Sequence, residues 1–300
     1  MLLLLLSCTE NNLTVFEGVD VFTQSPAHEV DILLVVDDSC SMEPYQEQLA
    51  TSFESFVRFL DESRTAWHIA VNTTDVDEHE GQLVDFIAWD DEDAADAFAA
   101  AVNVGTEGAG FEMGLEAARR TLEADASGFV RDEAAFSAIF VSDEEDASPL
   151  AVAEYIRTFE ALKGARSREV VDVSALVTLD AEECDTDWST VGQRYLRATE
   201  MTEGVAGSLC SEDFDPIVAE MGLSASRQYD VFELSEMPNA ATLELTLDDI
   251  DVPCGEGRWR YELQEEEPVI VFDREQLPPP ESVLVLRYFF GDGDEEAFCP

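Results

Sequence analysis

The sequence predicts an α/β fold with a doubly wound, mostly parallel sheet, followed by a small all-β domain at the C-terminus. Between residues 30 and 232, short apolar runs alternate with segments of helical period. This pattern is typical of a parallel sheet with helices on both faces. After residue 232 the helical period disappears, and Gly, Pro and acidic residues separate short strand-like runs. We therefore expect two domains, at 30–232 and 235–300.

The elements of the first domain follow in order from their apolar periods. Residues 30–36 form a continuous apolar run, as expected of a strand buried on both faces. A helix then begins at Glu43-Pro44, because proline suits the first turn of a helix. The later elements are expected at 67–71 (strand), 83–89 (edge strand), 91–102 and 111–123 (helices), 138–141 (strand), 150–163 (helix), 170–179 (strand), 188–202 (helix), 205–210 (strand) and 214–222 (helix).

The C-terminal region is predicted to be an independent β-sandwich-like domain without a metal site, which holds or spaces the first domain. Its strands are expected at 244–247, 258–261, 269–272 and 283–286. Its aromatic core is expected to comprise Trp259, Tyr261, Phe272, Tyr288 and Phe289. So small a core yields little net stability. A Cys254–Cys299 disulfide is therefore expected to add roughly 2–4 kcal/mol.

The composition excludes two classes of partner. The chain has 67 acidic and 16 basic residues and a formal charge of −51, and its single lysine is Lys163. It lacks the clustered basic residues that bind nucleic acid, or that dock a protein onto anionic lipid. Disorder is excluded as well, because 46% of the residues are hydrophobic. The acidic residues are spread evenly, which fits either a salt-rich habitat or a cation-attracting surface.

The N-terminus resembles that of a bacterial lipoprotein. An apolar run ends in Leu-Leu-Ser-Cys at residues 5–8, similar to the lipobox of that class. The resemblance implies a signal peptide at 1–7 and a lipid on Cys8, with the polar segment 8–29 as a tether. The apolar run is short and lacks basic residues, as expected if the true start lies upstream. We expect an exported protein of the cell envelope that meets the membrane only through its lipid anchor.

Six cysteines are present, and export favours disulfides between some of them. Cys184 and Cys210 bracket a predicted helix, while Cys254 and Cys299 bracket the C-terminal segment. We predict these two local disulfides, which leave Cys40 unpaired. Spacing alone leaves other pairings open.

One motif carries the chemistry of the chain. The first buried strand ends in Asp37-Asp38-Ser39-Cys40-Ser41, and a helix follows. Ligand sites of parallel sheets lie at the carboxyl ends of the strands. Alternate positions of this turn place carboxylate and hydroxyl oxygens together, and these are ligands that suit Mg²⁺. The motif resembles the metal-ion-dependent adhesion site (MIDAS) of von Willebrand factor type A (VWA) domains, Asp-x-Ser-x-Ser.

The resemblance covers about residues 30–232 and implies a Rossmann-like α/β fold with two further site residues. A threonine is expected before a later helix, where the sequence has Thr106. An aspartate is expected at the end of the next buried strand, where the sequence has Asp143. The family implies Ser39, Ser41 and Thr106 near the metal, with Asp37 and Asp143 binding it directly or through water. Mg²⁺ is the expected cofactor, with Mn²⁺ or Ca²⁺ as alternatives. Cys40 departs from the glycine that such proteins often have.

These residues predict a binding module that is not an enzyme. A carboxylate from a protein partner would complete the coordination of the metal. Two other hypotheses stay open. A metal-dependent hydrolase would need a base near Ser39, and only Asp38 or Glu107 are available. A structural envelope protein would carry a vestigial site, with Asp37 and Ser39 merely capping a helix. The chain has no nucleophile-elbow motif, P-loop or dinucleotide fingerprint.

Overall fold

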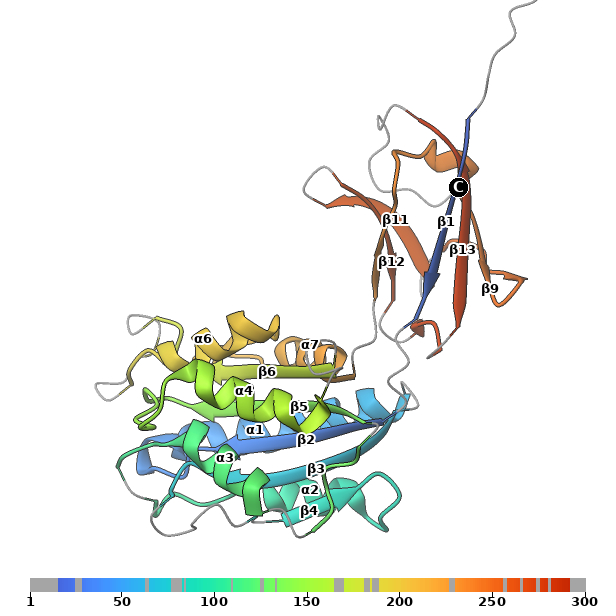
Figure 1. Ribbon diagram of the computed structural model, residues 1–300. Helices are drawn as coiled ribbons and strands as arrows, with labels where there is room; N and C mark the ends of the chain where they lie inside the picture. Colours follow the sequence, from blue (N-terminus) through green and yellow to red (C-terminus); the bar gives the residue numbers. More distant parts are fainter. Residues whose placement is uncertain are drawn as a thin grey trace, which may run out of the picture. The chain divides into compact units, whose positions relative to one another are not determined.

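The computed structural model divides the chain into two compact units, Ser25–Gln228 and the combination of Met1–Gln24 with Tyr229–Pro300. The first is an α/β unit and the second a β unit (Figure 1). The structure describes residues 16–291 except 25–28, 63–64, 77–82, 84, 109, 125–126, 133, 165–169, 181–183, 185–188, 227–229, 256–257, 265–266, 274–275 and 280–281.

The α/β unit is built on a six-stranded sheet of order β4-β3-β2-β5-β6-β7. All neighbouring strands are parallel except β4, the predicted edge strand, which runs antiparallel to β3. The apolar runs form the strands because both faces of the sheet are covered: every residue of β5 is buried. The strands are β2 (Glu29–Val36), β3 (Ala66–Thr73), β4 (Asp85–Ala88), β5 (Ala135–Ser142), β6 (Val171–Val177) and β7 (Ala206–Ser208).

Helices lie on both faces of this sheet, as Figure 1 shows. On one face α4 packs against α3 and α6, and on the other α1 packs against α2 and α7. This confirms the doubly wound α/β class predicted from the alternating pattern. The helices are α1 (Glu43–Glu62), α2 (Ala94–Ala101), α3 (Gly114–Ala124), α4 (Val152–Lys163), α6 (Gln193–Thr202) and α7 (Asp215–Ser226), and the short 3-10 helix η1 (Cys40–Met42) precedes α1.

The β unit consists of two antiparallel sheets, β1-β13-β9-β10 and β11-β12-β8. Side chains alternate along β13: Leu284, Leu286 and Tyr288 are buried, while Phe289 is 44% exposed. Phe289 was expected in the core, and this was wrong because its neighbour Tyr288 already faces inward. The strands are β1 (Glu17–Thr23), β8 (Val231–Glu233), β9 (Glu244–Leu247), β10 (Ile250–Asp251), β11 (Trp259–Gln264), β12 (Glu267–Phe272) and β13 (Val283–Phe289).

The segment expected to be a tether contains a strand of this unit. Glu17–Thr23 forms β1 and pairs with β13 along its whole length, from Glu17 opposite Phe289 to Thr23 opposite Val283. Asn12 and Pro26, which contributed to the prediction of a tether, lie outside the described residues. Within it, Val19 and Val21 alternate with other residues in a way that suits a strand. The β unit is therefore built from both ends of the chain.

The predicted disulfide between Cys184 and Cys210 is confirmed. Cys184 and Cys210 form a disulfide with their Cα atoms 5.3 Å apart, whereas Cys40 is exposed and has a free thiol. Cys254 takes part in a disulfide, but its predicted partner Cys299 lies outside the described residues. The predicted signal peptide and the lipid attachment residue Cys8 also lie outside them.

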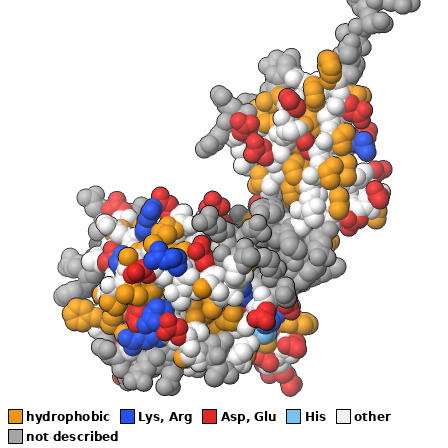
Figure 2. Space-filling view, in the orientation of Figure 1, with side chains coloured by type: hydrophobic (Ala, Val, Ile, Leu, Met, Phe, Trp, Pro, Cys, Tyr) orange, Lys and Arg blue, Asp and Glu red, His pale blue; other side chains and the backbone are white. Residues whose placement is uncertain are grey.

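Acidic side chains are exposed on both units on the face that Figure 2 shows. Basic side chains of the α/β unit take part in ion pairs along its helices, such as Arg119 with Glu116 and Glu123 on α3. A search of the described helices finds none that is long and apolar enough to cross a membrane.

Candidate metal centre

The predicted motif lies where the strand order of the sheet reverses. β2 is flanked by β3 on one side and β5 on the other. The chain first adds β3 and β4 on one side of β2 and then adds β5, β6 and β7 on the other. Such a switch point opens a crevice at the carboxyl ends of the strands. Asp37 directly follows β2, and Asp143 directly follows β5. The Asp37 amide donates to the carbonyl of Val141 at 2.9 Å, which ties the two strand ends together.

The turn after β2 folds back on its own aspartate. The Ser39 amide donates to Asp37 Oδ1 at 2.8 Å, an aspartate-centred turn that fits the preference of Asp for such positions. Ser39 precedes η1, and its carbonyl accepts from the Met42 amide at 3.1 Å. The turn thus brings Ser39 and Ser41 to the same side as Asp37.

Four of the five predicted site residues are joined by hydrogen bonds or by the turn itself. The hydroxyls of Ser39 and Ser41 lie 2.9 Å apart, and the Ser41 hydroxyl donates to Asp143 Oδ1 at 3.0 Å. Asp37, Ser39 and Asp143 are buried, whereas Ser41 is half-buried. The arrangement is a row of hydroxyls between two carboxylates, and it reaches solvent at Ser41.

The fifth predicted residue, Thr106, lies in the loop between α2 and α3. Its loop contacts the motif, because the Gly108 amide donates to the Asp38 carbonyl at 2.9 Å. Thr106 itself is half-buried, and none of the described contacts joins its side chain to Asp37 or Asp143. The structure therefore brings the loop to the site, but not the threonine hydroxyl into the hydrogen-bonded row.

Burial raises the pKa of both aspartates. The pKa of Asp37 rises to about 6, chiefly because the side chain is buried and also because Asp143 is negatively charged. Hydrogen bonds from Ser142, at 2.6 Å, and from Ser39 act in the opposite direction. Burial likewise raises the pKa of Asp143, which Ser41 and Ser189 partly offset. Among the described residues, no Arg, Lys or His forms an ion pair with Asp37 or Asp143.

A further carboxylate at this edge of the sheet was missed by the sequence analysis. Glu112 is 1% exposed and accepts a hydrogen bond from the Thr74 hydroxyl. Burial raises its pKa to about 8, and the charge of Asp37 adds to the shift. The predicted helix 111–123 placed Glu112 within a helix that begins at Phe111. In the structure α3 begins at Gly114, which leaves Phe111 outside the helix and 76% exposed.

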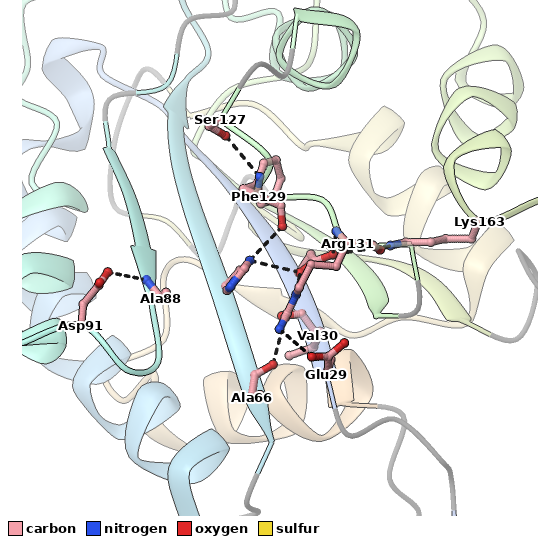
Figure 3. Close-up of polar contacts among 11 residues, drawn as sticks. Glu29, Val30, Ala66, Ala88, Asp91, Ser127, Phe129, Arg131 and Lys163 are labelled. Atoms are coloured by element: carbon pink, nitrogen blue, oxygen red, sulfur yellow. Dashed lines mark hydrogen bonds and ion pairs between the residues drawn. The ribbon is translucent and has the colours of Figure 1, made fainter.

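The amino end of β2 has different surroundings, and Figure 3 shows Arg131 and Lys163 there. Asp31 is fully buried, but the Arg131 side chain donates to its Oδ1 at 2.7 Å and the Arg131 amide to its Oδ2 at 2.6 Å. Lys163 Nζ lies 3.5 Å from Oδ2, and His68 Nδ1 lies 3.7 Å from Oδ1. The buried carboxylate at this end is thus balanced by basic side chains.

The donor set at the carboxyl end fits a hard divalent cation. Mg²⁺ binds few protein groups and keeps several waters, so two carboxylates and two hydroxyls suffice to hold it. Within the part of the chain that the structure describes, no three His, Cys, Asp or Glu side chains lie close enough to hold a metal together. A metal here would therefore depend on the hydroxyls of Ser39 and Ser41 and on water.

No family model and no curated protein matches the chain. Among solved structures, it is similar to the pilus adhesin SpaC of Lactobacillus rhamnosus GG, at 12% identity and a TM-score of 0.48, over 92% of this chain and 41% of that one. It is also similar to proximal thread matrix protein 1 of the mussel byssus, in a structure whose MIDAS motif holds zinc. That similarity has 16% identity and a TM-score of 0.46, over 69% of this chain and 48% of that one. The chain spans about half the length, or less, of the proteins it matches.

Proposed function

We propose that this chain is a VWA-type binding protein that attaches to a protein partner through a divalent metal held by Asp37, Ser39, Ser41 and Asp143. One observation carries the proposal. Buried carboxylates gather at the switch point of the sheet, with hydroxyls between them and no basic side chain of the described residues paired to Asp37 or Asp143. Buried charge without a counterion is costly. A bound cation removes that cost.

Each side chain of the proposed site has a different role toward the cation. The hydroxyls of Ser39 and Ser41, 2.9 Å apart, present two neutral oxygens to the cation. Asp37 and Asp143 bind it directly or through its waters, and Ser142 fixes Asp37 by donating to Oδ2. When bound, Mg²⁺ supplies an open coordination position for a carboxylate of the partner. Thr106 remains a candidate fifth group from the resemblance.

The proposed partner is a protein, and the proposed activity is binding without catalysis. An exposed aromatic side chain, Phe111, lies next to the buried Glu112 at the edge of the site and offers apolar contact area to a partner. His68 is the histidine among the described residues. It contacts the Phe129 carbonyl and Asp31 at the other end of the sheet, so it contributes to the fold there and not to the proposed site. We propose no nucleic-acid partner, because the chain is strongly acidic.

The proposed location is the cell envelope, in the periplasm or at the cell surface, with a lipid on Cys8 as the membrane anchor. The Cys184–Cys210 disulfide supports export, since such bonds persist in oxidising compartments. Mass spectrometry of the protein purified from membranes tests the anchor: a lipid-modified N-terminal Cys8 is expected, and an unmodified chain beginning at Met1 would contradict it.

Calorimetric titration of the intact chain with Mg²⁺ and Mn²⁺ tests the metal site. We expect one site per chain, at least a hundredfold weaker in Asp37→Asn and unchanged in the matched control Asp90→Asn, which alters an exposed aspartate. The absence of binding by the intact chain would contradict the proposal and favour a structural protein with a vestigial site.

A second measurement tests the open coordination position. Acetate serves as the probe for the partner's carboxylate, and the Mn²⁺-loaded protein should broaden the acetate methyl resonance well beyond the Asp37→Asn variant. Equal broadening in the two proteins would contradict a position open to a carboxylate. Mg²⁺-dependent turnover of a chromogenic ester or phosphate would instead support the hydrolase alternative.

A further inference from the structure

We infer that Glu112, rather than Thr106, is the fifth side chain of the metal centre, acting on a water bound to the metal. The inference deepens the proposed function and rests on it. It concerns a residue to which neither the motif nor the resemblance assigns a role. Three observations support it: the position of the backbone, the burial of the side chain, and the hydrogen bonding of its two oxygens.

The backbone of Glu112 is held across the end of β2. The amide of the next residue, Met113, donates to the carbonyl of Thr74, which follows β3, at 3.1 Å. The carbonyl of Glu112 accepts from the amide of Ala147, in the segment after β5, at 2.7 Å. β3 and β5 are the two neighbours of β2. These two hydrogen bonds tie Glu112 to the segments that follow both neighbours of β2, at the edge of the sheet where Asp37 begins the motif.

The side chain is buried at this position with one of its oxygens unsatisfied. Glu112 is 1% exposed, and the Thr74 hydroxyl donates to Oε2. Oε1 is buried and has no hydrogen-bond partner in the described part of the chain. A buried acceptor without a donor destabilises the folded chain. A water bound to the metal is a strong donor, and it would satisfy Oε1 from the side of the site.

Thr106 lacks these features. Its side chain is half-buried, and its hydroxyl makes none of the described hydrogen bonds to the motif. Gly105, the residue before it, has its carbonyl bound by the Gln46 side chain of α1, so the loop is held there through its backbone. The loop continues past Thr106 to Gly108, which lies against Asp38, and on to Glu112. The buried position at the end of this loop is therefore occupied by a carboxylate.

Contact through water agrees with the spacing of the carboxylates. No three acidic side chains of the described residues lie close enough to bind one metal directly. Glu112 nevertheless lies near enough to Asp37 for the two charges to influence each other. A third carboxylate in the outer coordination sphere increases the negative charge around the cation, and such outer partners typically change metal affinity 10–100-fold.

Calorimetric titration of the full chain with Mg²⁺ tests the role of Glu112 against that of Thr106. We expect Glu112→Gln, which keeps the size and an acceptor for Thr74, to bind Mg²⁺ at least tenfold more weakly. Thr106→Val should bind within twofold of the intact chain. Glu112→Asp restores the charge and should bind more tightly than Glu112→Gln, which a purely structural role would not require, since aspartate packs less well there.

Two further outcomes are informative. If Glu112→Gln binds like the intact chain while Asp37→Asn does not bind, the inference is overturned and the proposed function stands. If the intact chain binds no Mg²⁺, both fail together. Should Glu112→Gln not fold, the comparison of Glu112→Asp with Thr106→Val decides: a greater loss of affinity in Thr106→Val overturns the inference, and a greater loss in Glu112→Asp supports it.

Discussion

The two ends of β2 bury aspartates in opposite electrostatic surroundings. Asp31 at the amino end and Asp37 just past the carboxyl end are both fully buried. Asp31 is paired with Arg131 and lies 3.5 Å from the ammonium of Lys163, the single lysine of the chain. Asp37 receives hydrogen bonds from serines and faces the charge of Asp143. Among the described residues, basic side chains are paired with the aspartate at the amino end of β2, and none is paired with Asp37.

The two ends of β2 therefore differ in role: the contacts at the amino end hold strands together, and those at the carboxyl end form the proposed metal site. At the amino end, the Arg131 guanidinium also donates to the carbonyls of Val30 and Ala66, both at 2.9 Å, so the ion pair fastens neighbouring strands to the segment before β5. At the carboxyl end, no basic side chain of the described residues is paired with Asp37 or Asp143, and Ser41 is half-buried. The first arrangement pairs the buried charge within the chain, whereas the second becomes favourable when a cation binds.

Removal of the arginine at the amino end is expected to have the largest effect. Arg131→Met leaves Asp31 buried without its main partner, and breaking a buried pair in this way costs about 3–5 kcal/mol. Urea unfolding followed by circular dichroism measures the loss. The exposed pair Arg197–Glu200 provides the control, because Arg197→Met should cost less than about 1 kcal/mol. Similar losses in the two variants would mean that Asp31 does not depend on its counterion.

The opposite result is expected at the carboxyl end. Asp37→Asn removes a charge that repels Asp143, so the metal-free variant should be at least as stable as the intact chain. The intact chain should gain about 2.7 kcal/mol when Mg²⁺ is present at a hundred times its dissociation constant. The variant should gain nothing. Thermal unfolding with Mg²⁺ and with EDTA measures both, and an equal gain in the variant would place the metal elsewhere.

The stability of the metal-free protein should also depend on pH through Asp37. A carboxyl group with a raised pKa binds its proton more tightly in the folded chain than in the unfolded one. Its contribution to stability is therefore full at about pH 4 and is lost as the pH rises through about 6. From pH 4.5 to 7 the loss should be about 2 kcal/mol.

The measurement compares urea unfolding of the intact chain and Asp37→Asn in EDTA over this pH range. Other carboxyl groups of this acidic chain titrate in both proteins, so the difference between the two slopes reports Asp37. Identical slopes would show that Asp37 titrates normally in the folded chain.

Much of the α/β unit could be predicted from the sequence because its signals are local. The run 30–36 is apolar throughout since both faces of β2 are covered, and Asp37 and Asp143 come directly after buried strands. Position after a strand suffices to place such residues at the ligand-binding edge of a parallel sheet. The disulfide predicted between Cys184 and Cys210 is also present, although spacing alone left other pairings open.

The features that were missed depend on contacts between distant segments. β1 is a strand because β13, at the other end of the chain, pairs with it. Glu112 is one of 67 acidic residues, and its burial depends on the segments after β3 and β5 that hold its backbone. The counterions of Asp31 are likewise distant in sequence, so its burial beside Arg131 and Lys163 could not be inferred from the strand alone.

The smallest effect is expected for Lys163→Met at the amino end of β2. Lys163 Nζ lies 3.5 Å from Asp31 Oδ2, and burial lowers its pKa. Methionine fills a similar volume, and the variant still has Arg131 beside Asp31, so urea unfolding should show a loss of only about 1 kcal/mol.

An independent measurement uses the fact that the chain has one lysine: acetylation mapped by mass spectrometry should leave Lys163 unmodified in the folded protein and modify it in urea. If Lys163→Met lost as much stability as Arg131→Met, the prediction that Arg131 is the main counterion of Asp31 would be wrong.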